Sequence, residues 1–368
     1  MVYVKRGYPR LVVDLNKLYH NIEVVKNKCA ETGAEIAGVI KGCTGLVPCA
    51  RQFERAGVKY LASSRIEQLA RLKENGFRTP LLMVRIPMLS ETEDIVRYCD
   101  CSLNSEMAVL NALNEQAGLQ NKIHKVILMA DCGDLREGWW DKGEMVRDAL
   151  RVEEQLANLH LEGVGFNVGC YGSVMATPDK LEELIHVAED IEGAIGRELE
   201  IISGGATGSF MRVMDGDLPE RINMLRIGEG ILLAYDLPVL YGYDSGDLYR
   251  DVFTLRAEVI EVKDKPSHPV GKIGYDAFGH QIRYEDRGIR RRALLGLGKC
   301  DYGDPAELLP RMQGLQILGA SSDHTILDIQ DVVRRGIEIR VGDILEFDLK
   351  YATIVYLTNS DNVEVVYI

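Results

Sequence analysis

Lys41 is the residue whose position most clearly suggests chemistry. It ends an apolar run that begins at Ile36, so its amine is expected at the end of a buried strand. Burial lowers the pKa of an amine and favours a nucleophile that forms a Schiff base with a carbonyl compound. The alternative is a lysine that extends its apolar stem along the surface and keeps its charge in water. Position alone leaves both interpretations open.

A second candidate is the glycine-rich segment Ser203–Ser209, which follows a β-branched run. Glycines let backbone N–H groups approach an anion closely, and the start of a helix favours negative charge. A tight turn that needs positive φ would use glycine in the same way without any ligand. Arg226 and Gly228 follow the next strand-like run and could complete a phosphate site.

Arg136 follows a predicted strand and a glycine turn. Its guanidinium could hold a substrate carboxylate in a bidentate fork. It could equally form an internal ion pair with Asp131, Asp134 or Glu137, which lie within five residues of it. The spacing does not distinguish between these two roles.

Three residues near the end of the chain could also take part. Tyr275 or Asp276 could act as a general base, although a tyrosine flanked by glycine is more often a packed residue of a turn. Asp323 precedes a histidine and a threonine and is expected to form an Asx turn.

The elements that must position these residues follow a repeating pattern of a short strand, a loop and an amphipathic helix. Eight strand-like runs are expected at residues 35–41, 60–64, 80–86, 101–105, 126–133, 161–169, 199–206 and 224–230. This alternation predicts an α/β protein with parallel strands, and eight of them match a closed (β/α)8 barrel of the TIM type. The active residues of such barrels lie at the C-terminal ends of the strands, which is where Lys41, Arg136, Asn167, Ser203 and Arg226 fall.

The character of the sequence changes after about residue 235. Residues 236–368 contain alternating strand-like runs with little helical periodicity, which predicts a mostly β C-terminal domain. Residues 1–235 are predicted to form the barrel domain, although a strand at residues 8–15 could join the β domain instead.

The composition excludes several classes of function. The chain has 368 residues with 43 basic and 56 acidic side chains, and its net charge of −13 argues against nucleic acid or an anionic membrane as a partner. Arg290–Arg292 is the one basic cluster, and we expect it to form a solvated face. No signal peptide or membrane span is recognisable. The eight cysteines form no CxxC pair and no histidines cluster at metal-ligand spacing, so we expect a cytoplasmic protein with reduced thiols and no metal.

Several segments, in this order along nearly the whole chain, resemble the fold-type III enzymes that use pyridoxal 5′-phosphate (PLP), the alanine racemase-like group. They are Ala37–Lys41, Asp131–Arg136, Arg226–Gly228 and Gly319–Asp323, with Asp343 in the expected downstream strand. Five more segments resemble the subgroup that acts on ornithine, namely Arg85–Leu89, Gly133–Gly138, Ile273–Gly279, Tyr284–Arg290 and Leu318–His324.

The resemblance implies specific roles for residues of this chain. PLP would be bound as a Schiff base on Lys41, which would also act as one of two bases. Arg226 would face the pyridine nitrogen, and Arg136 with Asp323 would bind the substrate. The remaining contacts to the cofactor would come from Asn167, Ser203, Gly205, Thr207, Gly228 and Tyr351.

The resemblance also implies a reaction and an assembly. The expected function is a PLP-dependent racemase that interconverts L- and D-amino acids, ornithine being the expected substrate, by proton transfer at Cα between two bases. The second base is Tyr275 or Asp276 and would come from the β domain of another copy, so a homodimer with composite active sites is implied. The tyrosine that the group usually carries shortly after the lysine is absent here, where Gly42–Gly45 stands.

Three alternatives stay open at this point. The substrate could be alanine, lysine or another amino acid. The chain could be a PLP-dependent decarboxylase of basic amino acids, because Asn167–Cys170 resembles a stretch of those enzymes. It could also be a non-enzymatic PLP carrier, although such proteins resemble the barrel alone.

Overall fold

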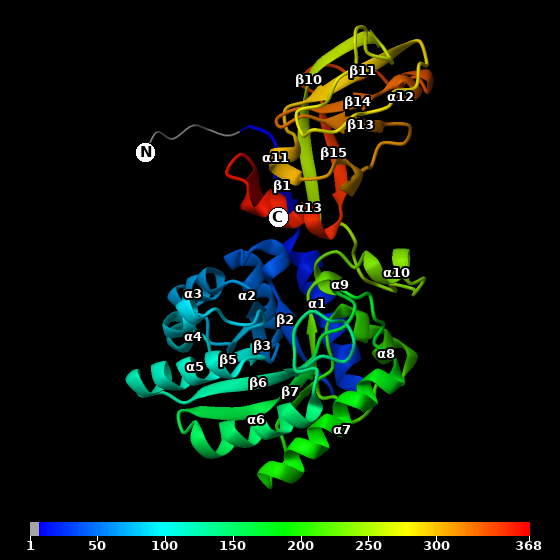
Figure 1. Cartoon of the computed structure of the whole chain (residues 1–368). Helices are drawn as coiled ribbons and strands as arrows, with labels where there is room; N and C mark the ends of the chain where they lie inside the picture. The colour runs from blue at the N-terminus through cyan, green and yellow to red at the C-terminus, as the bar shows by residue number, and fades with distance from the viewer. Residues whose placement is uncertain (1–6) are drawn as a thin grey trace. The chain divides into compact units, whose positions relative to one another are not determined.

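The computed structural model describes residues 7–368, which form two compact units (Figure 1). One unit comprises Leu18–Tyr249, and the other combines the described residues up to Lys17 with Arg250–Ile368. The first unit therefore continues past residue 235, the position at which the composition of the sequence changes.

The first unit is a closed barrel of eight parallel strands in which β9 pairs with β2. In order around the barrel the strands are β2 (Glu35–Val39), β3 (Tyr60–Ser63), β4 (Leu81–Met83), β5 (Cys101–Asn104), β6 (His124–Ala130), β7 (Leu159–Phe166), β8 (Ile201–Ser203) and β9 (Met224–Ile227). Parallel strands need crossover connections, and here helices supply them. Because sequence order equals order around the barrel, the C-terminal ends of all eight strands meet at one rim.

Helices surround the strands of this barrel (Figure 1). They are α1 (Leu15–Glu31), α2 (Val47–Ala56), α3 (Ile66–Glu74), α4 (Thr92–Tyr98), α5 (Met107–Leu119), α6 (Lys142–Gln155), α7 (Pro178–Ile195), α8 (Phe210–Asp215), α9 (Glu229–Leu232) and α10 (Asp236–Leu240), with 3₁₀ turns η1 (Lys41–Cys43), η2 (Leu89–Glu91) and η3 (Thr207–Ser209). Helix α7 shows the sequence logic: Pro178 occupies its first turn and Gly196 ends it in the left-handed region. It buries Leu181, Leu184 and Ala188, which share one helical face.

Apolar side chains fill the interior of the barrel. They form one cluster of Ala37, Val39, Tyr60, Ala62, Leu82, Cys101, Leu103, Ile127, Met129, Ile201 and Met224. A packed interior leaves the two rims as the places where polar groups on the strands can meet.

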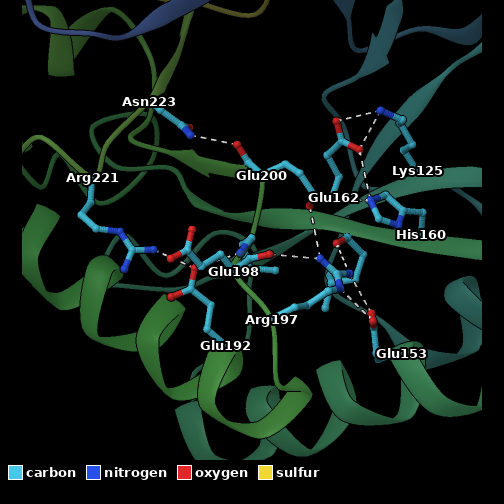
Figure 2. Close-up of polar contacts among 12 residues, drawn as sticks. Lys125, Glu153, His160, Glu162, Glu192, Arg197, Glu198, Glu200, Arg221 and Asn223 are labelled. Carbon is cyan, nitrogen blue, oxygen red and sulfur yellow. Dashed lines mark hydrogen bonds and ion pairs between the residues drawn. The ribbon is translucent and has the colours of Figure 1, made fainter.

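Charged side chains pair with one another near the N-terminal ends of the barrel strands (Figure 2). Lys125 Nζ lies 2.8 Å from Glu162 Oε2, and Arg197 Nε lies 2.8 Å from Glu153 Oε1. His160 Nε2 lies 3.7 Å from Glu162 Oε2. The charges at this end of the barrel are therefore neutralised within the protein.

The second unit is a mostly antiparallel sheet with the strand order β12-β15-β10-β11-β14-β13, to which β1 and β16 are added. Its strands are β1 (Arg10–Val13), β10 (Phe253–Pro266), β11 (Ile289–Leu295), β12 (Leu308–Pro310), β13 (Gln316–Ala320), β14 (Thr325–Asp328), β15 (Ile344–Leu349) and β16 (Glu364–Tyr367). Strand β1 pairs antiparallel with β10 and parallel with β16. The barrel and this sheet together confirm the predicted fold class.

Two features of the second unit differ from the sequence prediction. Besides the turn η4 (Pro305–Glu307), it contains the helices α11 (Lys299–Tyr302), α12 (Gln330–Arg334) and α13 (Tyr351–Asn359). Helix α13 forms although its sequence is rich in β-branched and aromatic residues, because Thr353, Ile354 and Leu357 bury one helical face. The arginine cluster is not a solvated face: Arg290 is buried, and its Nε donates to Asp328 at 2.8 Å.

Among residues 7–368, each helix is too short or too polar to cross a bilayer.

Candidate functional site

The C-terminal rim of the barrel collects the polar residues that the sequence places at strand ends. Lys41 opens η1 directly after β2, and Arg136 lies in the loop after β6. Asn167 follows β7, Ser203 ends β8, and Arg226 is the next-to-last residue of β9. All five belong to the same compact unit.

Lys41 is half-buried at this rim. Burial lowers the pKa of its amine, and the guanidinium groups of Arg136 and Arg226 lower it further, against an opposing effect of the Cys170 thiol. A lower pKa enlarges the fraction of neutral amine, which is the form that attacks a carbonyl carbon. Burial and the two guanidinium groups therefore favour the neutral form of this amine.

Arg226 is only 4 % exposed. It donates through Nη1 to the hydroxyl of Ser203 and through Nη2 to the carbonyl of Phe166 at 2.7 Å. Burial lowers its pKa to about 10, so the guanidinium stays charged at neutral pH. Within residues 7–368 it forms no ion pair, which leaves a buried cation without a carboxylate partner.

In the glycine-rich loop after β8, the backbone at Gly205 lies close to the side chain of Ser209. Gly205 has φ of +100°, and a Cβ there would lie 2.6 Å from Ser209 Oγ, so a side chain does not fit. The Ser209 hydroxyl is buried and has no hydrogen-bond partner among the described residues. Thr207 Oγ1 accepts the N–H of Gly230 at 3.2 Å and so links this loop to α9. Sequence analysis did not single out Ser209.

Asn167 and Gly228 complete the described rim. Asn167 is 8 % exposed, and its Nδ2 has no partner within the part of the chain that the structure describes. A Cβ on Gly228 would lie 3.1 Å from Val39, so the end of β9 packs tightly on β2.

These features fit PLP. A lysine amine of lowered pKa, a buried cation without an ion pair, and the unpaired polar groups of Asn167 and Ser209 all lie at the strand ends of one barrel or in the loops that follow them. An aldehyde, an aromatic nitrogen and a phosphate would each find a complementary group there.

Arg136 is paired inside the protein. Its Nε and Nη2 both donate to the carboxylate of Glu137, and this pair raises the pKa of Arg136. Of the three acids that the sequence offered, Asp131 and Asp134 instead accept backbone N–H groups. Arg136 therefore forms an internal ion pair, and its partner in that pair is the adjacent residue, Glu137.

Cys170 is a rim residue that sequence analysis assigned to no role. Its side chain is exposed, and it acts electrostatically on both Lys41 and Arg136. It follows Asn167 by three residues, so examination of every polar residue after each strand would have found it.

The other four predicted site residues lie in the second unit. The side chain of Tyr275 is 77 % exposed. Asp276 accepts the N–H groups of two residues that follow it, and Asp323 accepts the hydroxyl of Ser322 at 2.6 Å. Tyr351 is the first residue of α13. The structure thus divides the predicted site between the two units.

Comparison with known proteins identifies the family. The model of the alanine racemase N-terminal domain matches residues 13–236. The ornithine racemase of Acetoanaerobium sticklandii is 40 % identical over 357 residues, which cover 97 % of this chain and 99 % of that protein. The lysine racemase of Thermotoga maritima is 38 % identical over 361 residues, 98 % of each chain. A crystal structure of alanine racemase from a D-cycloserine-producing Streptomyces lavendulae has a TM-score of 0.77 at 17 % identity and covers 100 % of this chain and 98 % of that one.

The chain belongs to the alanine racemase family. The predicted class of enzyme, a PLP-dependent amino-acid racemase, is thereby confirmed.

Proposed function

We propose that this enzyme interconverts L- and D-ornithine, with PLP held on Lys41 at the rim of the barrel. The observation that carries the proposal is the pair of rim cations, Lys41 and Arg226, that have no carboxylate partner among residues 7–368, in a chain 40 % identical to an ornithine racemase over nearly its full length.

In this proposal the rim residues divide the work of holding the cofactor. Thr207 and Tyr351 bind the phosphate together with the backbone at Gly205 and Gly228, and Ser209 supplies a further hydroxyl. Bound PLP supplies an electron sink for the negative charge that develops at Cα of the substrate. The described contacts that support this division are the unpaired Ser209 hydroxyl and the close packing at Gly205.

Arg226 is the residue that we expect to contact the pyridine ring of PLP. With a pKa of about 10 its guanidinium keeps its protons at neutral pH. It would therefore donate a hydrogen bond to the pyridine nitrogen of bound PLP without protonating it. Ser203 and the carbonyl of Phe166 support that role because they fix two of its nitrogens. Asn167, whose Nδ2 has no described partner, would help to hold the cofactor beside it.

The two proton transfers at Cα need groups on opposite faces. Lys41 Nζ, with its lowered pKa, takes or returns the proton on one face. For the other face the contacts favour Tyr275 over Asp276. The backbone N–H groups of His280 and Phe278 hydrogen-bond to the Asp276 carboxylate at 2.7 and 2.9 Å and lower its pKa, which makes it a weak proton acceptor.

Tyr275 would act in a partner subunit. Its exposed phenol is free to reach another chain, so we propose a homodimer in which each β domain supplies this tyrosine to the other copy. Tyr275→Phe is expected to lower kcat about 10²- to 10⁴-fold, and Asp276→Asn far less. The opposite ranking would assign the second base to Asp276.

The experiment that tests the function combines a spectrum with chiral analysis. The purified protein is loaded with PLP, its visible absorbance is compared with that of Lys41→Ala, and products from L-ornithine, L-lysine and L-alanine are separated by chirality. We expect a lysine-dependent absorbance band and D-ornithine as the fastest product. Carbon dioxide release from L-ornithine without any D-isomer would instead identify a decarboxylase, and faster racemisation of alanine would refute the choice of substrate.

A further inference from the structure

The loop after β6 carries four acidic residues, and three of them, Asp131, Asp134 and the N-cap residue Asp141, accept backbone N–H groups. Asp131 Oδ1 accepts the N–H of Gly133 at 2.9 Å and of Leu135 at 3.1 Å. These bonds close the turn in which Leu135 adopts φ of +59°. Asp131 therefore shapes the loop through Oδ1.

Asp134 is committed to the neighbouring loop. Its two oxygens accept the N–H groups of Gly169 at 2.9 Å and Tyr171 at 3.0 Å, both in the segment that follows β7. Although burial opposes it, these bonds lower the pKa of Asp134, so it stays ionised. It joins the loops after β6 and β7 to each other.

Glu137 is the one acid of this loop whose described partner is a side chain. Its carboxylate is 16 % exposed and is held by Arg136. It also lies close enough to Lys41 and Arg226 to raise the pKa of both groups. A carboxylate is thus present near the rim cations, in an ion pair with Arg136.

We infer that Glu137 binds the distal ammonium of a diamino acid substrate, while the substrate carboxylate takes its place on Arg136. The inference rests on the proposed function, because it requires the substrate to bind at this rim. The exchange conserves charge: one internal Arg–Glu pair is replaced by two pairs between protein and substrate.

This exchange explains discrimination between substrates in physical terms. An amino acid with an apolar side chain would occupy Arg136 and leave the half-buried Glu137 carboxylate without a partner, which is unfavourable. A side chain that ends in an ammonium removes that cost. The subsite therefore favours the class of α-amino acids with a cationic side chain, and it does so by penalising the others.

The test uses PLP-loaded enzyme and two substrates of matching shape, L-ornithine and L-norvaline, which lacks the distal amine. Glu137→Gln is expected to lower kcat/KM for ornithine about 10- to 100-fold, mainly through KM, the range for loss of a hydrogen bond to a charged group. The same variant should leave kcat/KM for norvaline unchanged or raise it, because Arg136 is released from its internal partner. Glu144→Gln, a surface change in the first turn of α6, is the matched control and should alter neither value.

Each outcome has a distinct meaning. An equal loss for ornithine and norvaline would show that Glu137 only positions Arg136 and would overturn the inference. Glu137→Ala also removes the charge and serves if the glutamine variant does not fold; a ratio of ornithine to norvaline equal to that of wild type in a folded Glu137→Ala would also overturn the inference. A wild-type enzyme that racemises alanine but no diamino acid would refute the proposed function itself, before any variant is made.

Discussion

The two rims of the barrel use the same kinds of charged residue in opposite ways. Near the N-terminal ends of the strands, Lys125 and Arg197 each have a carboxylate partner at 2.8 Å (Figure 2). At the C-terminal rim, Lys41 and Arg226 have none within residues 7–368, and Arg136 pairs with the adjacent Glu137. Charges neutralised inside the protein stabilise it, whereas charges left without partners cost stability and attract a ligand.

Lys41→Ala is the substitution expected to show the largest difference between the two rims in their effects on activity and on stability. Racemase activity should fall at least about 10³-fold, because in the proposed function the variant loses both the amine that would carry the cofactor and one proton-transfer group. The free energy of unfolding of the cofactor-free protein should stay the same or rise, since a buried amine without an ion pair is removed. Chiral chromatography and denaturant unfolding measure the two quantities; a variant that loses stability as well as activity would contradict the contrast.

Lys125→Met tests the other rim. It removes the lysine partner of Glu162, whose side chain is 6 % exposed, and leaves only His160 Nε2 at 3.7 Å and the Tyr60 hydroxyl at 3.2 Å beside that carboxylate, so the free energy of unfolding should fall by about 1–3 kcal/mol. The kcat/KM of the folded enzyme should not change, because Lys125 lies at the far end of the strand from the catalytic rim.

Lys28→Met provides the control for that experiment. Lys28 pairs with Glu31 on the surface of α1, where both side chains are more than half exposed, so its removal should change stability by less than about 0.5 kcal/mol. Equal losses in the two variants would show that the pair at the N-terminal rim is an ordinary surface pair.

A smaller effect than that at Lys125 concerns pH and the pair between Arg197 and Glu153. Hydrogen bonds from Arg197 lower the pKa of Glu153 from its ordinary value of 4.5, so the pair stabilises the fold above pH 4.5 and its contribution is lost as the pH falls through the folded-state pKa. Glu153→Gln should therefore cost about 0.5–1 kcal/mol at neutral pH. Unfolding curves of the variant and the wild type should converge in acid, and a difference that grows in acid would refute this assignment.

Much of the catalytic rim could be predicted because a (β/α)8 barrel converts position along the chain into position in space. Once the strands were recognised, Lys41, Ser203 and Arg226 had to lie on the same rim. What the sequence could not decide was which partner each charge takes. Asp131, Asp134 and Glu137 are all within reach of Arg136, and the backbone turn at Leu135 selects Glu137.

Ion-pair partners from strands that are distant in the sequence could not be predicted either. Arg290 was expected in solvent, yet Asp328 reaches it because β11 and β14 are paired neighbours in the sheet. Helix α13 was missed because β-branched residues favour strands locally, and the burial of one face overrides that preference. Both errors arise where tertiary contacts outweigh local signals.

The bridge that Asp134 forms between two loops has a consequence for engineering. Its buried carboxylate hydrogen-bonds the segment after β7 to the segment after β6. The Arg136–Glu137 pair and the stretch from Asn167 to Cys170 are therefore structurally coupled. A transplant of either loop alone from a racemase of different specificity would break this joint. The two loops must be exchanged together if the enzyme is to be redirected to a new amino acid.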